Sequence, residues 1–470
     1  MNKLIFSLLF LYSSYSEASL RSLISELLAE NYDIKKAEVD NQISRNQSLD
    51  VLDTFRWGVD ATYTSFTNEL DTASNINNNG ETQTNSLNLT RPFSWGGSLK
   101  FENTLEKSNS YFSVQAVKPV IWEFSQYLTY SQDIGKNFFG RNSRREINLA
   151  TEASHIAELN NEKMINDRVS DFVRSYARAA FALSKVNFQK QAIERAKKRF
   201  DLISRRVRDG LSLKVDKLEA QNALMIQKEN LSQIEVEFDS FKRDLSSLLH
   251  RRIRDNEIYE IEKVKLKEYD ISKSIIADSI DLKILSKRYD VAKMNYEIAK
   301  NNFVPDVNFS FSYGANDFSS SSSESLSNGK ISGENTFSTF VVSLSVPIDW
   351  SLEKRAKETE FIKFELAKYQ NRSVKDNLSL AFNNLIFRRG QLKNLINSAK
   401  ERINIARKTV GEYSNLYRRG KVRLDQVIRA EENYLQVQRN YAQLISSKLE
   451  LEVSISQIFG KTKTFTKNNL

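Results

Sequence analysis

The sequence predicts a mainly α-helical fold, a long antiparallel α-helical barrel that carries β-barrel strands and is built from two duplicated halves. Long stretches have apolar residues at intervals of three and four, which is typical of amphipathic helices. Shorter stretches between them alternate apolar and polar residues, which is typical of strands with one wet face. The same order of elements occurs twice along the chain, as an internal duplication predicts.

The composition restricts the chemistry that this chain can perform. With 4 prolines and 14 glycines in 470 residues, few residues interrupt helices. Cysteine is absent and there are 2 histidines, so we expect no disulfide, no metal site and no cofactor. The net charge is +10, but basic and acidic residues are mixed along the helices, as in residues 194–199. This mixture indicates solvated helix faces, and we expect no nucleic-acid partner.

The first eighteen residues have the features of a secretory signal peptide. Lys3 precedes an apolar run from Leu4 to Leu11, and Ser16 and Ala18 are the small residues of a cleavage site after about Ala18. The alternative is a buried N-terminal helix. No segment is apolar for long enough to cross a bilayer as a helix, so entry into a membrane would require a β-barrel.

Six stretches are predicted as helices. They are residues 20 to about 55, 141–208, 212–250, 275–302, 352–418 and 424–458. The two longest would each run about 100 Å at 1.5 Å per residue, and the shorter ones about half of that. Two short helices stacked end to end therefore match one long helix. A narrow coiled-coil seam supports thin walls of packed helices, and its residues are Leu231, Ile234, Phe238, Phe241, Leu245 and Leu248.

Six alternating segments are predicted as strands. They lie near residues 59–66, 84–93, 98–106, 123–133, 309–313 and 342–348. Polar loops at 75–80 and 319–333 would join hairpins. All four tryptophans lie at or near strand ends, as in the aromatic girdle of a transmembrane barrel: Trp57, Trp95, Trp122 and Trp350. The alternative is an ordinary half-buried sheet.

The duplication can be read in register. A shift of 248 places Asp33 on Asp281 and Phe55 on Phe303, and Gly210 later corresponds to Gly420. We therefore expect the following divisions. They are a signal peptide at 1–18, helical barrel at 19–56, strands at 57–135, helical barrel with an equatorial linker at 136–302, strands at 303–350, helical barrel at 351–460 and a tail at 461–470.

Together these features resemble the TolC family of outer-membrane efflux and secretion channels. Local signatures are Phe303-Val304-Pro305-Asp306-Val307 before a strand and Val346-Pro347-Ile348 before a long helix. The resemblance implies a homotrimer in the outer membrane of a Gram-negative bacterium, with its helices in the periplasm. It also implies three further partners: outer-membrane lipid, a periplasmic adaptor protein and an inner-membrane transporter of the RND, ABC or MFS type. The family's minimal form has two strands per repeat, whereas the first half here has about four.

The resemblance implies a gate at the two turns between helices. In the family, a tyrosine three residues before one tip glycine and an aspartate six residues after the other hold the tips together. Tyr417 stands three before Gly420, and Asp216 stands six after Gly210. Both residue types therefore match at their positions.

The third member of the family's gate, an arginine, does not match in register. Val422 occupies its position, between Lys421 and Arg423. We expect Asp216 to bond Tyr417, with Arg423 or Lys421 as the charged partner. The alternative is that these are solvated turn residues.

Arginines make the predicted tips basic. They are Arg205, Arg206, Arg208, Arg418 and Arg419. We expect this surface to receive an acidic adaptor tip with strong salt dependence. Where the family can carry acidic rings this chain has Gln426 and Arg429, so a cation-selective constriction is not expected, although Asp425 is adjacent.

Two rival functions remain open at this point. A coiled-coil structural protein of the cell envelope would explain the helices but not the strand pairs. A helical-bundle metalloenzyme would need a second copy of the Glu152-x-x-His155 half-site, which the sequence does not contain. We therefore expect a channel and not an enzyme.

Overall fold

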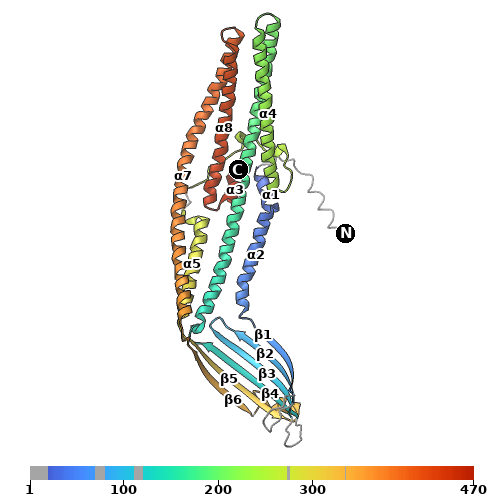
Figure 1. Cartoon of the computed structure of the whole chain (residues 1–470), viewed down its shortest axis with the longest axis vertical. Helices are drawn as coiled ribbons and strands as arrows, with labels where there is room; N and C mark the ends of the chain where they lie inside the picture. Colours follow the sequence, from blue (N-terminus) through green and yellow to red (C-terminus); the bar gives the residue numbers. More distant parts are fainter. Residues whose placement is uncertain (1–19, 69–79, 111–119, 272–275, 334, 470) are drawn as a thin grey trace, which may run out of the picture. The chain divides into compact units, whose positions relative to one another are not determined.

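The computed structural model describes residues 20–68, 80–110, 120–271, 276–333 and 335–469. The expected signal peptide at 1–18 lies outside these residues, as does most of the Asn-rich loop at 75–80. The chain divides into two compact units (Figure 1). The helical unit comprises residues 1–40, 158–284 and 371–470, and the sheet unit comprises 41–157 and 285–370.

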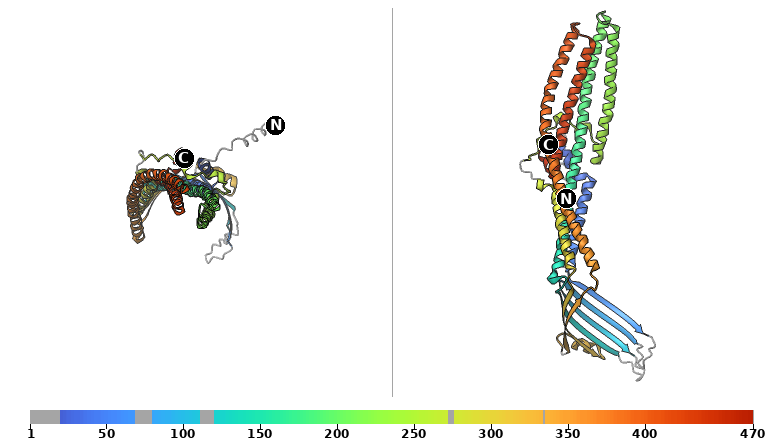
Figure 2. Two further views of the ribbon diagram at one scale, coloured as in Figure 1. Left: turned by 90° about the horizontal axis from the view of Figure 1, so that it is seen from above. Right: turned by 60° about the vertical axis from the view of Figure 1, so that its left-hand side comes forward.

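The long helices predicted from the apolar spacing are confirmed. They are α3 (Arg141–Arg208), α4 (Lys214–Leu248), α5 (Ile280–Asn301), α7 (Ser351–Arg418) and α8 (Leu424–Ile458). In the helical unit, α3 lies beside α4 and α7 lies beside α8 (Figure 2). Among the described helices, none combines the length and hydropathy needed to cross a membrane.

The predicted first helix is interrupted. It consists of α1 (Leu20–Glu30) and α2 (Tyr32–Asp53), with Asn31 between them. The Asn31 Oδ1 accepts backbone N–H groups two and three residues further on, at 3.0 and 3.2 Å. This is an N-cap, which begins a new helix, and its Nδ2 also donates to the carbonyl of Leu248 at 2.9 Å. The prediction of one continuous helix is therefore wrong, because a side-chain cap replaces the helical hydrogen bonds at this point.

The core of the helical unit is centred on α3. Phe172 and Tyr176 are fully buried, and the α4 seam contributes the buried side chains of Ile234, Phe238 and Leu245. The other seam residues are partly buried against the same core: Leu231, Phe241 and Leu248. The predicted coiled-coil seam is thus confirmed.

The equatorial linker and the C-terminal segment pack into this core. The described part of the linker between α4 and α5 contains the 3₁₀ turns η2 (Asp255–Glu257), η3 (Ile261–Lys263) and η4 (Ile276–Asp278). The expected tail at 461–470 instead forms a helix, α9 (Thr462–Asn469), whose Phe465 is buried. A buried aromatic anchor explains why this segment is ordered.

A buried carboxylate ties the linker to two helices. Glu452 of α8 is fully buried, and it accepts the backbone N–H of Tyr269 at 2.7 Å and the Nη2 of Arg389 at 3.0 Å. Burial raises the pKa of Glu452, and the two donors oppose that rise. The contact joins the linker, α7 and α8 within the helical unit.

The predicted strands form one antiparallel sheet. They are β1 (Gly58–Asn68), β2 (Gly80–Pro92), β3 (Gly97–Ser110), β4 (Val120–Asp133), β5 (Asp306–Ser319) and β6 (Thr336–Ser345). Their spatial order follows the sequence from β1 to β6. The hairpin formed by β2 and β3, which has no counterpart in the second repeat, is therefore inside the sheet.

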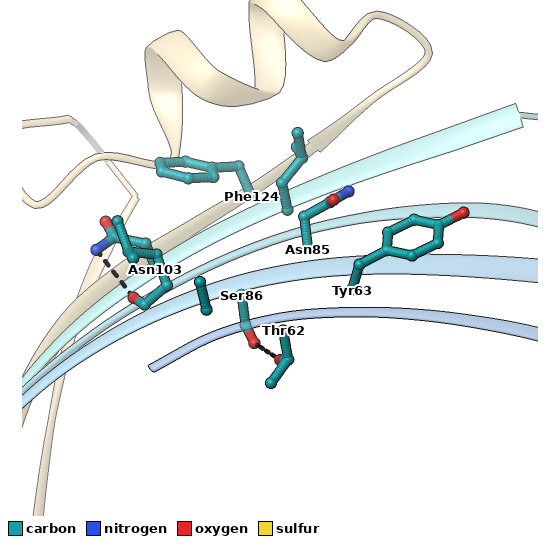
Figure 3. A pocket seen from close by; sticks show the side chains of 9 residues that line it. Thr62, Tyr63, Asn85, Ser86, Asn103 and Phe124 are labelled. Carbon is teal, nitrogen blue, oxygen red and sulfur yellow. Dashed lines mark hydrogen bonds between the residues drawn. The ribbon is translucent and has the colours of Figure 1, made fainter. Parts of the chain in front are cut away.

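The two faces of the sheet differ in chemistry. In β3, Leu99, Phe101 and Leu105 alternate with Lys100 and Glu102. The cross-strand register places apolar side chains opposite one another, as Phe101 opposite Leu128, so the difference runs across neighbouring strands. A hollow of about 450 Å³ lies on the more apolar face. Figure 3 shows that Thr62 and Ser86 are directed to the opposite side of the sheet.

The expected polar loop at 319–333 is partly helical. It contains α6 (Ser322–Asn328), which packs against β4 and β5. Gly329 comes so close to the backbone of β4 that a Cβ there would lie 2.3 Å from the Phe124 oxygen. The loop is therefore folded onto the sheet, because small residues permit this close approach.

Candidate functional site

The two helix–helix turns of the helical unit have the same backbone geometry. Gly210 follows α3 with a φ of 73°, and Gly420 follows α7 with a φ of 70°. After each glycine, one backbone N–H donates back to the helix: Leu211 to the Arg206 oxygen at 2.7 Å, and Lys421 to the Leu416 oxygen at 3.0 Å. This is the Schellman ending, in which a left-handed glycine closes a helix. Figure 1 shows both turns at one end of the helices that they join.

Asp216 caps its own helix. It lies in the first turn of α4, and its Oδ2 accepts the backbone N–H of Leu213 at 3.2 Å. A carboxylate here also interacts favourably with the positive end of the helix dipole. The expected hydrogen bond between Asp216 and Tyr417 is not formed among the described residues, because the cap holds the carboxylate.

Tyr417 instead lies beside the other turn. The Ser212 side chain, which lies between α3 and α4, interacts with its hydroxyl and lowers the pKa of Tyr417 against the larger effect of burial. The Tyr417 side chain is buried and packs in a cluster with Ile203 of α3 and Val427 of α8. Burial raises the pKa of Tyr417, and the nearby charge of Asp216 raises it further. Tyr417 thus links both helix pairs within one chain.

Arg206 reinforces this link. Its guanidinium carbon lies 5.5 Å from the centroid of the Tyr417 ring, and its Nη1 donates to the Tyr417 backbone oxygen at 3.3 Å. The first contact is a cation–π interaction, and the second satisfies a carbonyl at the end of α7. Arg206 therefore joins α3 to the end of α7.

A cavity of about 670 Å³ lies between the two turns. Its lining brings together five of the predicted gate residues: Asp216, Tyr417, Arg423, Gly210 and Gly420. Lys421 is exposed and does not line it. Arg423 forms a loose, exposed ion pair with Asp425 at 3.5 Å instead of pairing with Asp216. The charged partner proposed for Asp216 is therefore placed elsewhere.

The basic tip residues are mostly at the surface. Arg205, Arg208, Arg418 and Arg419 are exposed, and Arg206 is half-buried against Tyr417. They belong to the last turns of α3 and α7 and the residue after α7, where positive charge is favoured by the helix dipole. The two helix ends thus present arginines beside the cavity.

A second basic site was not predicted from the sequence. The run at 194–199 was expected to be a solvated helix face, but the Arg199 side chain is only 7% exposed and Arg195 is half-buried. Both line a cavity of about 390 Å³ between α3, α7 and α8. Their spacing of four residues on one face of α3 was the available signal. Residues 194–199 contain both acidic and basic side chains, so this spacing did not stand out in the sequence.

The tryptophans are distributed between the two ends of the sheet. Trp57, Trp95 and Trp350 lie next to the strand ends that connect to helices or to the short turn between β2 and β3. Trp122 pairs with Lys107 near the opposite end. Trp57 and Trp95 are about half exposed, so their rings are available to surroundings outside the chain.

The described residues contain no group of three or more histidine, cysteine or acidic side chains arranged for a metal ion. Glu152, the acidic member of the half-site considered above, forms an ion pair with Lys287 at 2.9 Å.

Comparison with known proteins identifies related molecules. Residues 271–461 match the family model described as outer membrane efflux protein. The fold is similar to the outer membrane protein VceC from Vibrio cholerae, with 16% identity, a TM-score of 0.68, and coverage of 94% of this chain and 96% of that one. It is also similar to the CmeC outer membrane channel of Campylobacter jejuni, with 14% identity, a TM-score of 0.67, and coverage of 96% and 90%.

A third similar structure is the MtrE outer membrane channel of Neisseria gonorrhoeae in its open state. It has 14% identity, a TM-score of 0.66, and coverage of 95% of this chain and 89% of that one. None of the curated proteins matches this sequence. Each likeness extends over both units of the chain.

Proposed function

We propose that three copies of this chain assemble into one conduit across the outer membrane and the periplasm, because residues 271–461 match the outer membrane efflux protein family and the fold is similar to that of outer membrane channels. The protein acts in the outer membrane as the channel-tunnel component of an efflux system. In our proposal, an inner-membrane transporter supplies the exported substrate and a periplasmic adaptor joins the two. The family contains channels, and the conduit needs no catalytic group.

The observation that carries the proposal is an open sheet with two chemically different faces. β1 and β6 are the edges of the described sheet, and each is paired on one side only. Residues along both strands are exposed on both faces. Unpaired edges are not tolerated in lipid, so β1 of one copy would pair with β6 of the next until the ring closes. Three sheets of six strands would give a barrel of eighteen strands.

The face chemistry supports the orientation of this barrel. The face with Leu99, Phe101 and Leu105 would meet lipid, and the face with Lys100 and Glu102 would line the water-filled interior. The half-exposed Trp57 and Trp95 would anchor one rim of the barrel, and Trp122 the other. A non-channel coiled-coil protein is not favoured, because it gives no role to this sheet.

We place the periplasmic gate at the cavity between the two turns. Tyr417 and Ser212 would act as the latch that holds the helix pairs of one chain together, with Asp216 shaping the turn from its cap position. The exposed Arg205, Arg208, Arg418 and Arg419 would form the surface that receives the adaptor. Acidic adaptor residues would complement this surface, and salt would weaken the contact.

The test is a planar bilayer experiment on the purified full chain. We expect a trimer on native mass spectrometry in detergent and discrete conductance steps in the bilayer, because the closed barrel encloses water. A variant with Val341→Lys and Leu344→Lys on β6 places two charges on the outer edge strand and should give fewer trimers and fewer conducting events. A monomer that never conducts would refute the channel.

A further inference from the structure

The cavity between α3, α7 and α8 is lined by an excess of positive charge. Five basic side chains line it, and Glu431 is the one acidic side chain in the lining: Arg195, Lys198, Arg199, Arg205 and Arg418 are the basic ones. Glu431 pairs with Arg199 through its Nη1. Lys198 pairs with Glu194, which lies outside the lining, at 2.7 Å. Among the described residues, three arginines around a cavity of about 390 Å³ are thus left without an ion pair: Arg195, Arg205 and Arg418.

Two of these guanidinium groups have buried donors without acceptors. The Nε of Arg199 and both the Nε and Nη2 of Arg195 are buried and make no hydrogen bond in the described structure. The Arg199 side chain is more than nine-tenths buried. Buried charged donors are costly when they are unpaired, so an arrangement of this kind is expected to receive an acceptor from outside the chain.

Packing fixes the position of these groups. The guanidinium of Arg195 lies 5.2 Å from the centroid of the Tyr434 ring of α8, which holds it against the cavity wall. Burial lowers the pKa of Arg195, and the charge of Glu431 opposes this change. A second anion next to Arg195 would oppose this effect of burial by Coulombic attraction, as Glu431 does.

The cavity is continuous with the basic surface of the tip. Arg205 and Arg418 line the cavity and are also exposed members of the tip surface. A ligand in the cavity would therefore lie beside these two arginines as well as the buried guanidinium groups. A carboxylate on a protein side chain can contact the buried guanidinium groups as a planar acceptor, while the backbone that carries it remains on the tip surface.

We propose that this cavity binds a carboxylate, and that an acidic side chain of the protein docked on the tips supplies it. The inference rests on the proposed function, because it presumes that a partner docks there. Arg195 and Arg199 would hold the carboxylate oxygens by charge-assisted hydrogen bonds. Lys198, Arg205 and Arg418 would attract the acidic surface around it.

The test uses the full-length trimer in detergent and a labelled helical peptide with glutamate pairs four residues apart. A second peptide has glutamine at every glutamate position. We expect the glutamate peptide to bind by fluorescence anisotropy, and Arg195→Gln to weaken its affinity about tenfold, as loss of a charge-assisted contact predicts. Arg402→Gln, which removes one exposed charge of α7 outside the cavity lining, should change the affinity less than about twofold.

Three outcomes would overturn the proposal. They are equal binding of the glutamine peptide, equal losses for Arg195→Gln and Arg402→Gln, and inorganic phosphate that binds through Arg195 while the glutamate peptide does not bind. Arg195→Lys keeps the positive charge but removes the planar guanidinium that can bind both carboxylate oxygens. Native mass spectrometry of each variant, which should show the trimer, excludes misfolding. If the channels conduct normally but do not bind the glutamate peptide, this inference alone is refuted. If the chain forms no channel, the proposed function is refuted.

Discussion

At the scale of single residues, burial determines where Tyr417, the tyrosine of the proposed gate, is placed. Tyr417 was expected to bond Asp216, but the short Asp216 side chain closes the first turn of its own helix through Leu213. The Tyr417 hydroxyl instead interacts with Ser212, which lies in the same turn as Asp216. The residue types at the proposed gate could be read from the sequence. Their pairing could not, because it depends on which partner lies close to each side chain in the folded chain.

This pairing gives a prediction for the gate. Tyr417→Phe and Ser212→Ala each remove one hydroxyl of the proposed latch, so we expect either variant to raise the resting single-channel conductance. The double variant should resemble either single variant, because both remove the same proposed contact between the two hydroxyls. Single-channel recording of the set measures this coupling.

A matched control for the latch is Tyr413→Phe, one helical turn earlier on α7. Tyr413 packs at the edge of the same cluster, so its loss should leave the resting conductance near that of the wild type. Effects of Tyr417→Phe and Ser212→Ala that simply add would show that the two hydroxyls act independently.

At the scale of elements, the two turns depend on left-handed glycines. Gly210 and Gly420 have φ values of 73° and 70°, and a Cβ at either would meet no atom within 4 Å. Any penalty for alanine there is therefore one of backbone conformation and not of steric contact. We expect Gly210→Ala and Gly420→Ala each to destabilise the turn by about 1 kcal/mol and to lower the thermal unfolding temperature.

A helical glycine of α7 provides the control with the opposite sign. A Cβ at Gly411 would also meet no atom within 4 Å, but this residue lies inside α7, where alanine is the better helix former. Gly411→Ala should raise the unfolding temperature, with a gain of about 0.5–1 kcal/mol. Thermal unfolding followed by circular dichroism measures all three variants. A lower unfolding temperature for Gly411→Ala as well as for the two turn variants would contradict the conformational argument.

The helices and strands themselves were largely predictable from periodicity. The predicted ends of α3 and α8 agree with the structure, because long runs at intervals of three and four have no competing pattern. The break at Asn31 was missed, since an asparagine inside such a run does not reveal whether it caps a helix or continues one. The helix α9 was missed because its short, polar sequence becomes helical on burying Phe465.

At the scale of the whole molecule, the number of strands sets the expected width of the barrel. The second repeat contributes β5 and β6, whereas the first contributes β1 to β4 in the same sheet. Barrel diameter grows roughly linearly with strand number. The proposed barrel should therefore be wider than one built from two strands per repeat.

Deleting the hairpin tests this width. The last residue of β1 and the first residue of β4 lie at the same end of the strands. Residues 69–119 can therefore be replaced by a two-residue Asn-Gly turn. The trimer would then have twelve strands, and the largest polyethylene glycol that enters from the barrel side should be smaller than for the wild type. An unchanged exclusion size in an intact trimer would place β2 and β3 outside the wall of the pore.

The sequence by itself determined the periodic features of this protein, namely its long helices, its alternating strands, its duplicated order and the glycines of its two turns. These follow from local rules, because hydrophobic spacing and backbone freedom act between near neighbours. Only the tertiary structure decided that Tyr417 meets Ser212, that Arg195 and Arg199 are enclosed by α7 and α8, and that β2 and β3 enter the sheet. Each of these depends on which distant segment covers a side chain or pairs with a strand, and the local pattern does not say which segment that will be.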